Sequence, residues 1–208
     1  MLPADAQRVL DFWFDVPGGP AWNTYRREWF RKSSDFDDTV RADFLPVWQS
    51  AFAAMRGGSA DPGDDLTDDP TDDWSVTPTG ACARVLLLDQ LPRNMFRGDP
   101  RSFATDAAAL ALTLRMIARG WDRQLPTIYH RMFCLMPLQH AEDLAIQRES
   151  VRQHAALQEE TGIEQAIWAE RHCAIIARFG RFPHRNAVLG RTSTAEERAF
   201  LQQPGSSF

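Results

Sequence analysis

Lysine is nearly absent from this chain of 208 residues, since Lys32 is the only lysine among 23 basic residues and the others are arginines. A coding bias toward arginine accounts for such a composition. The functional alternative is that arginine forks recognise carboxylates or other anions in bidentate fashion. Because the count does not separate these alternatives, the positions of the arginines have to decide.

Cysteines and long apolar runs are also scarce. Cys82, Cys134 and Cys173 lie far apart in apolar segments, which indicates reduced core thiols rather than a disulfide framework. The longest strong apolar run, Val85–Leu88, is far below the ~20 residues of a membrane-spanning helix. Charged residues interrupt the N-terminal apolar stretch. We therefore expect no membrane association, no secretory signal and a cytoplasmic location.

The common catalytic and metal-binding motifs are missing. The sequence contains no Gly-x-Ser-x-Gly elbow and no Gly-x-x-x-x-Gly-Lys phosphate loop. It also contains no His-Glu-x-x-His, Glu-x-x-His or Cys-x-x-Cys pattern. We therefore expect neither a metal nor a cofactor, and no reaction can be assigned from a motif.

The formal net charge of −5 comes from one segment. Seven aspartates lie between residues 61 and 73, and without them 21 acids face 23 bases, an excess of about +2. The composition of residues 57–78 predicts a mobile acidic insert. A calcium loop is not expected, because Pro62 and Pro70 interrupt the spacing and the required glycine and glutamate are missing.

Apolar spacing predicts an all-α protein of antiparallel helical hairpins in a single domain, residues 1–208. We expect Pro46 to kink or break its helix and Pro137 to end another. The expected helices cover residues 4–14, 22–32, 35–55, 79–91, 99–119, 126–135, 139–160 and 163–179, with a short last helix opened by a capping box at 193–196.

Histidines lie on several apolar stripes. In the expected helix 139–160, His140 and Gln147 share a face with core residues, and His172 does so in the next helix. Core histidines are more often satisfied by hydrogen bonds than used as ligands or bases. In helix 99–119 the spacing predicts a core face of Phe103, Ala107, Leu110, Leu114 and Ile117.

A Pro-Arg-Asn pattern occurs twice, and each copy follows a helix that is expected to be buried. The first Arg-Asn segment is Leu91–Gly98, and the second is Phe182–Arg191. Asp89 precedes the first segment at the carboxyl end of an apolar helix, where the helix dipole disfavours a carboxylate. It therefore needs a cationic partner, and Arg93 or Arg97 is nearest. The repeat marks either a site or a structural clasp.

The second segment and the residues before it interleave arginine with phenylalanine. Such a composition can bind nucleic acid, but the patch is short and no nucleic-acid module is recognisable. Nucleic acid is therefore not expected as a partner. A small anion or a carboxylate-ended peptide fits the local arginine density better, and a buttressed turn without a ligand is the simplest alternative.

Several long motifs together resemble a known bacterial family, domain-of-unknown-function family 924. The resemblance covers nearly the whole chain and implies an all-helical fold similar to tetratricopeptide-repeat proteins. It implies no activity, and the acidic insert departs from the family pattern. The motifs are Val9–Phe14, Trp29–Phe30 with Phe36–Asp37, Leu88–Gly98, Phe103–Asp106, Met136–Glu142 and Arg178–Arg191.

Two functions are compatible with these residues. The first is a binding module for an anionic small molecule or peptide at a cleft rich in arginine, asparagine and histidine. The second is an enzyme in which Asp89 or Glu142 works with His140 or His184 while arginines clamp the substrate. A purely structural interaction surface is a third possibility. The candidate residues are Asp89, Gln90, Arg93, Asn94, Arg97, His140, Glu142, Arg181, His184, Arg185, Asn186 and Arg191.

Both functions share one geometric hypothesis. In a stack of helical hairpins, equivalent segments can lie on one side, so the two Arg-Asn segments would line one concave site together with His140 and Glu142. Arg93 and Arg185 on opposite surfaces would contradict it.

Overall fold

The computed structural model describes residues 2–57 and 73–206, and helices are the only regular secondary structure in those ranges. The all-α prediction is therefore confirmed. In the same ranges, no helix combines the length and the apolarity needed to cross a membrane. The α-helices are α1 (Ala4–Phe14), α2 (Ser34–Gly57), α3 (Pro78–Val85), α4 (Leu91–Met95), α5 (Asp106–Ala118), α6 (Ile128–His140), α7 (Leu144–Thr161), α8 (Ala166–Phe179) and α9 (Ala195–Leu201).

The chain divides into two compact units. The first unit comprises Met1–Arg97 and Arg101–Pro137, and the second comprises Gly98–Pro100 and Leu138–Phe208. The boundary falls inside α6, after Pro137. The expectation of a single domain stays a prediction.

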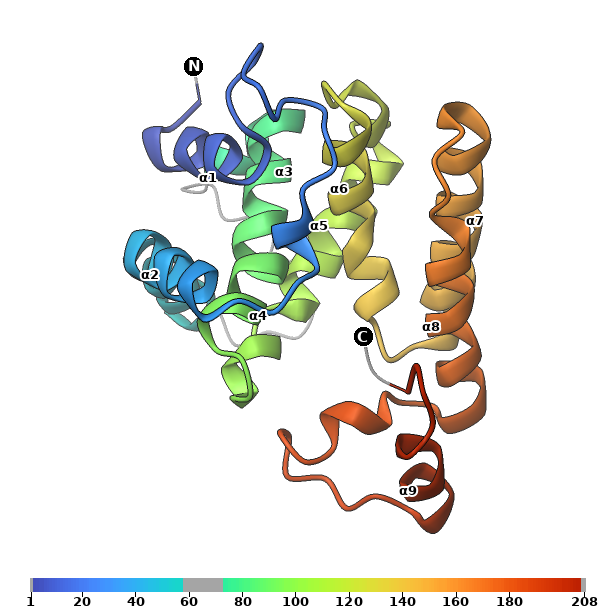
Figure 1. Cartoon of the computed structure of the whole chain (residues 1–208). Helices are drawn as coiled ribbons and strands as arrows, with labels where there is room; N and C mark the ends of the chain where they lie inside the picture. Colours follow the sequence, from blue (N-terminus) through green and yellow to red (C-terminus); the bar gives the residue numbers. More distant parts are fainter. Residues whose placement is uncertain (1, 58–72, 207–208) are drawn as a thin grey trace. The chain divides into compact units, whose positions relative to one another are not determined.

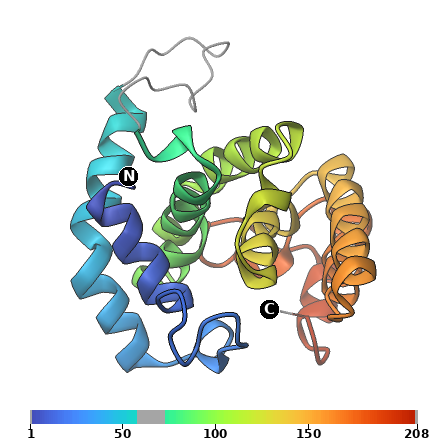
Figure 2. The same cartoon turned by 90° about the horizontal axis from the view of Figure 1, so that it is seen from above.

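The centre of the first unit is a continuous helical rod from Pro78 to Met95, made of α3, the π-helical turn Leu86–Gln90 and α4. Helices α1 and α5 pack against α3, and α2 packs against α4 (Figures 1 and 2). Nearly every side chain of the rod is buried. Because burying one large apolar side chain contributes about 1.5–3 kcal/mol, this rod dominates the core of the unit.

The π-helical turn has a local cause in Pro92. Proline has no N–H, so it cannot donate to the carbonyl of Leu88 four residues earlier, and its ring crowds that carbonyl. The chain widens here, and the N–H of Leu91 donates to the carbonyl of Leu86. The Leu88 carbonyl instead accepts from the hydroxyl of Thr105 at 2.5 Å. The first Arg-Asn segment therefore begins inside α4, and its turn starts only at Phe96, which corrects the sequence-based expectation of a turn.

Helix α1 has the bounds that the sequence predicts, and the helix expected at 22–32 does not form. Only a 3-10 turn, Arg27–Trp29, occurs there. The segment is held by its rings rather than by helical hydrogen bonds. Trp29 stacks on Trp13 at 6.5 Å between centroids and meets the edge of Phe133 at 4.9 Å.

Neither helix is broken at its proline, which corrects the expectation for Pro137, whereas the alternative of a kink at Pro46 stays a prediction. Helix α2 continues through Pro46, where both Pro46 and Ala42 lie on the exposed face. Water can therefore satisfy the carbonyl that the missing proline N–H leaves open. Helix α6 likewise continues through Pro137 to His140.

Several other expected boundaries were wrong. The region 99–119 forms a 3-10 turn, Pro100–Phe103, followed by α5. Helix α5 is apolar on nearly all of its faces, so the spacing of its apolar residues does not identify the buried face, and the predicted core face was wrong. It buries Ala108, Ala109, Leu112, Thr113 and Met116.

At the start of α7 the carboxylate of Asp143 accepts from the backbone N–H groups of Ala145 and Ile146. This cap separates α7 from α6 and divides the long helix expected at 139–160, so His140 and Gln147 do not share one helical face.

The acidic insert falls largely outside the described residues. Residues 58–72 are not among them, so the prediction of a mobile insert there stays a prediction. The expected linker 57–78 is otherwise shorter than predicted, because Asp73–Val76 forms a 3-10 turn and α3 begins at Pro78.

The second unit is built on a helical hairpin. Helices α7 and α8 pack side by side, and Gly162 with φ of 73° ends α7 in the left-handed conformation that glycine favours (Figure 1). Ile175 and Ile176 of α8 form a small core with Phe182 of the loop that follows. Helix α9 starts with a capping box of Thr194 and Glu197, one residue later than predicted.

Candidate functional site

Arg93 of the first Arg-Asn segment lies between two carboxylates of the first unit. Its guanidinium donates to both carboxylate oxygens of Asp106 at 2.9 Å and lies 3.3 Å from the Asp89 carboxylate. Burial lowers the pKa of Arg93, but Asp89 and Asp106 outweigh it and hold this pKa above its ordinary value. The predicted pairing of Asp89 with Arg93 is therefore confirmed.

Asp89 is fully buried, so its charge requires compensation. An isolated buried carboxylate costs several kcal/mol, whereas one that is paired and hydrogen-bonded is tolerated. Gln90 donates to this carboxylate at 2.6 Å, and Arg93 also donates to the Asp89 backbone carbonyl at 2.5 Å. These contacts bind the π-helical turn to the start of α4.

The other polar residues of the first segment join α4 to α2. Asn94 donates to Asp37 at 2.8 Å, and Arg97 binds the same carboxylate in bidentate fashion at 2.7 and 2.8 Å. Burial raises the pKa of Asp37, but the hydrogen bonds from Arg97 and Asn94 lower it by more, so this pKa lies below its ordinary value. The side chains of the first segment thus make the contacts of a structural clasp.

In the second Arg-Asn segment, Glu142 holds the chain on both sides of Phe182. Its carboxylate accepts from the Phe182 N–H at 2.8 Å and from Arg191 at 2.6 and 2.9 Å. Burial raises the pKa of Glu142, and the bonds from Arg191 and Phe182 lower it more strongly, so the pKa lies below its ordinary value. Arg191 closes the loop by donating to the Phe182 carbonyl at 3.2 Å.

Arg181 likewise holds the loop through an ion pair, in this case with a carboxylate of α9. It binds Glu197 in bidentate fashion at 2.7 and 2.9 Å and donates to the Thr192 carbonyl at 3.0 Å. Arg181 and the Thr194 N–H lower the pKa of Glu197 to about 2. Asn186 donates to Ser193 at 3.1 Å. Arg181 and Arg191 are therefore engaged with acids that hold the loop.

The remaining candidates of the second unit gather around the buried ring of Phe182. The His172 and His184 rings lie 5.7 and 5.5 Å from it, and the Arg185 guanidinium lies over it at 4.6 Å. The His140 ring is 6.4 Å from His172. We call His140, His172, His184 and Arg185 the imidazole–guanidinium cluster. His172 was noted in the sequence only as a core histidine, and its place in this cluster was missed.

The cluster suppresses protonation of its own imidazoles. Burial lowers the pKa of His172 to about 3, and the positive charges of His140, Arg185 and His184 contribute. Burial also lowers the pKa of His184 to about 4, with Arg185 as the next cause and Glu142 opposing. His172 and His184 are therefore neutral at pH 7, and the positive charge that disfavours their protonation at this pH is that of Arg185.

A second polar group of the second unit lies between α6 and α7 and was not recognised as a network from the sequence. His154 is fully buried, with Nε2 at 2.7 Å from Gln139 and Nδ1 at 2.9 Å from the Ser150 carbonyl. Gln147 donates to the carbonyls of Gln139 and Ala141 at 2.7 and 2.8 Å. Only the spacing of Ser150 and His154 could have indicated this group.

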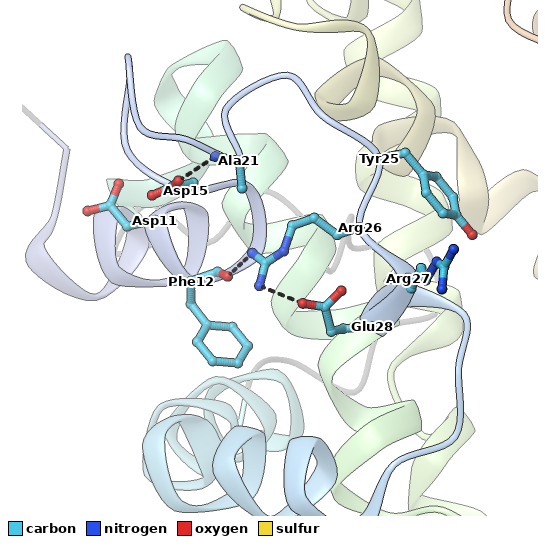
Figure 3. Close-up of a pocket in the computed structure, with 8 residues that line it drawn as sticks. All are labelled: Asp11, Phe12, Asp15, Ala21, Tyr25, Arg26, Arg27 and Glu28. Atoms are coloured by element: carbon cyan, nitrogen blue, oxygen red, sulfur yellow. Dashed lines mark hydrogen bonds and ion pairs between the residues drawn. The ribbon is translucent and has the colours of Figure 1, made fainter.

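A surface pocket of about 490 Å³ lies at the carboxyl end of α1 in the first unit (Figure 3). The motif Val9–Phe14 includes two of its lining residues, Asp11 and Phe12, but did not indicate a pocket. Arg26 crosses it and donates to the carbonyls of Phe12 and Trp13 at 2.7 and 2.9 Å, which caps α1. The pocket is lined by Asp11, Phe12, Asp15, Ala21, Tyr25, Arg26, Arg27 and Glu28.

Asp15 shapes this pocket through its backbone. It has a φ of 70°, which is uncommon for a residue other than glycine. Its carboxylate accepts from the N–H groups of Ala21 and Val16, and these two bonds lower the pKa of Asp15. Tyr25 and Arg27 lie next to each other at the other side of Arg26 (Figure 3).

The two Arg-Asn segments belong to different units, so each has been built up from its own contacts. The hypothesis that Arg93 and Arg185 line one concave site stays a prediction. Within residues 2–57 and 73–206, no group of three or more His, Cys, Asp or Glu side chains is arranged to hold a metal ion.

Comparison with known proteins shows which family the chain belongs to. A solved structure of a protein of unknown function from Agrobacterium tumefaciens is similar to this chain, with 34% sequence identity, a TM-score of 0.74, and coverage of 95% of this chain and 96% of that one. None of the curated proteins matches the chain. The profile of a family of bacterial proteins of unknown function, DUF924, matches residues 9–205. The match extends over both units and both Arg-Asn segments, and the chain belongs to the DUF924 family.

Proposed function

We propose that this protein is a binding module for an anionic small molecule or a peptide carboxylate, and that the imidazole–guanidinium cluster receives the anion. Four of the five arginines considered from the sequence, Arg93, Arg97, Arg181 and Arg191, are engaged with carboxylates. The proposal is placed on Arg185 and its three imidazole neighbours because they gather around the ring of Phe182.

The gathering of the Arg185 guanidinium and two imidazoles around Phe182 is the observation that carries this proposal, and the lowered pKa values of His172 and His184 support it. His172 and His184 each lose basicity through burial and through the positive charge of their neighbours. An anion bound within a few ångströms opposes the effect of the neighbouring positive charge on the histidine pKa, because an opposite charge favours the protonated imidazole. The free energy of anion binding and the rise in the histidine pKa values then both measure the interaction between the anion and the imidazoles.

The chemistry of the cluster suits a carboxylate. A guanidinium offers paired N–H donors in a plane that matches two carboxylate oxygens. The imidazoles add donors from other elements, and Phe182 provides an apolar floor beneath Arg185. The class of ligand is thus a small molecule or a peptide end that bears a carboxylate.

Replacing Arg185 tests the proposal. We expect Arg185→Ala to abolish binding of citrate, measured by isothermal titration calorimetry, while the circular dichroism and melting temperature of the folded protein are retained. Arg178→Ala is the matched control, because Arg178 also lies over a phenylalanine ring, at 4.7 Å from Phe179, but pairs with the exposed Glu196. Equal citrate binding by both variants contradicts the proposal.

A second variant covers the case in which Arg185→Ala does not fold. Arg185→Lys keeps the positive charge and loses the bidentate fork. A folded Arg185→Lys protein with weakened citrate binding supports the proposal. If Arg185→Ala unfolds and Arg185→Lys binds citrate as the wild type does, Arg185 is a structural clasp like Arg93.

The enzyme remains a second candidate because His184 is neutral at pH 7 and is influenced by the carboxylate of Glu142. A neutral imidazole next to a carboxylate can act as a general base. NMR spectra of a mixture of small carboxylates incubated with the protein distinguish the two functions. Conversion of one compound by the wild type, lost in His184→Gln, favours the enzyme, whereas unchanged compounds with saturable binding favour the module.

A further inference from the structure

The segment Tyr25–Lys32 of the first unit presents aromatic rings and cations together at the surface. Tyr25 and Phe30 are each 53% exposed, more than any other aromatic side chain among the described residues. Arg27, Arg31 and Lys32 are exposed beside them. The motif Trp29–Phe30 falls within this segment but did not indicate a binding surface, and the segment lies apart from both Arg-Asn segments along the chain.

The rings form an ordered stack. Phe133 is fully buried, Phe30 stacks on it at 6.0 Å with an interplanar angle of 13°, and Tyr25 stacks on Phe30 with the same separation and angle. The edge of Trp29 supports Tyr25 at 6.1 Å. Among the described residues Tyr25 is the last ring, so the stack ends at an exposed aromatic side chain.

The cations beside the stack are not neutralised within the described part of the chain. The side chains of Arg27, Arg31 and Lys32 make no hydrogen bond or ion pair with any other described residue. The one acid of the segment, Glu28, lies 3.7 Å from Arg26. The segment therefore carries an excess positive charge, in contrast to the paired arginines of the two Arg-Asn segments.

We propose that the Tyr25–Lys32 surface binds an aromatic base that carries phosphate, as a mononucleotide or as single-stranded nucleic acid. The base extends the stack on Tyr25, and the phosphate groups lie against Arg27, Arg31 and Lys32. Base–aromatic stacking combined with a cationic track is the chemistry by which single strands are bound without sequence preference. An acidic peptide satisfies the cations but leaves the stack unused.

This inference does not depend on the anion site of the second unit. The expectation against nucleic acid rested on the small basic excess of the whole chain and on the segment 178–186. The Tyr25–Lys32 surface differs because Arg27, Arg31 and Lys32 make no ion pair with any other described residue, and because the exposed rings of Tyr25 and Phe30 are stacked.

Fluorescence anisotropy with a labelled single-stranded oligothymidylate of about 10 nucleotides tests the proposal on the full chain, at low ionic strength. We expect Tyr25→Ala to weaken binding by about tenfold and Tyr25→Phe to retain it, because phenylalanine preserves the stack. Replacing Arg31 and Lys32 together by glutamine removes two phosphate contacts, and the slope of log K against log salt falls by roughly 1.4.

Trp168→Ala and Arg171→Gln are matched controls. In the second unit Trp168 is 45% exposed and Arg171 lies over its ring at 4.9 Å, but no other described ring stacks on Trp168. Both variants should bind the oligothymidylate as the wild type does. Competition with thymidine monophosphate separates the two ligand sources. If the surface is a mononucleotide site, thymidine monophosphate displaces the labelled oligothymidylate. If it is a single-strand site, only unlabelled oligothymidylate does so.

Three results overturn the proposal. The first is the absence of saturable binding by either ligand. The second is equal binding by Tyr25→Ala and the wild type. The third is displacement of the oligothymidylate by an oligoglutamate peptide of equal charge as effectively as by unlabelled oligothymidylate, which indicates that charge alone is recognised.

Discussion

Arg93→Met tests whether the first Arg-Asn segment is a clasp. The substitution keeps much of the apolar stem and removes the charge between Asp89 and Asp106. Asp89 is fully buried and then keeps only the donor of Gln90 among the contacts described above. Breaking a buried ion pair by removing one partner costs about 3–5 kcal/mol, and we expect about 3 kcal/mol because Gln90 still donates.

Urea unfolding followed by tryptophan fluorescence measures this loss as a lower midpoint at an unchanged slope. Arg178→Met is the control, because the exposed pair of Arg178 and Glu196 contributes at most about 1 kcal/mol. The double variant with Arg93→Met and Asp89→Asn should lose less stability than the sum of the losses of the two single variants, by at least about 1 kcal/mol. A loss for Arg93→Met no larger than that of Arg178→Met would refute the clasp.

Three further predictions concern stability. Thr105→Val leaves the buried Leu88 carbonyl without its hydroxyl donor, and we expect a loss of about 1–3 kcal/mol in urea unfolding. Gly162→Ala places a side chain at φ of 73° in open space, so only the backbone is strained and the melting curve should reveal a loss of about 1–2 kcal/mol. His154 has a pKa of about 4 when folded and an ordinary value of 6.5 when unfolded, with burial as the main cause. The unfolded chain binds the extra proton between these values, so stability falls as pH drops from 6.5 to 4, and His154→Gln should flatten that part of the profile.

The helical class and one clasp could be predicted from sequence because local chemistry determines them. Helix α1 ends where its apolar spacing ends, and the predicted bounds of 4–14 are those observed. The helix dipole at the end of an apolar helix indicated that Asp89 needs a cation, and Arg93 is one turn away. Both inferences use residues within about one helical turn of each other.

The second partner of Arg93 could not be predicted in this way. Asp106 follows it by 13 residues, on the next helix, and only the packing of α5 brings the two together. The same holds for the imidazole–guanidinium cluster, whose members come from the end of α6, the middle of α8 and the loop after α8. Sequence spacing gives no distance between such segments.

The region 22–32 shows a different limit. Its aromatic residues match a helical stripe, yet the rings of Trp29 and Phe30 pack on Phe133 from an irregular backbone. Packing of large rings can replace helical hydrogen bonds when the segment is short, since each ring buries a large area. The exposed end of the stack at Tyr25 was therefore not foreseen.

The titration of His172 and His184 tests the proposed anion site most directly. Their pKa values, followed by NMR of the imidazole carbons with and without saturating citrate, start at about 3 and about 4 in the free protein. The account predicts that citrate raises both values, because an anion stabilises the protonated imidazoles, and that Arg185→Ala removes the citrate effect. Citrate that binds without changing either pKa, or that changes them equally in Arg185→Ala, would contradict it.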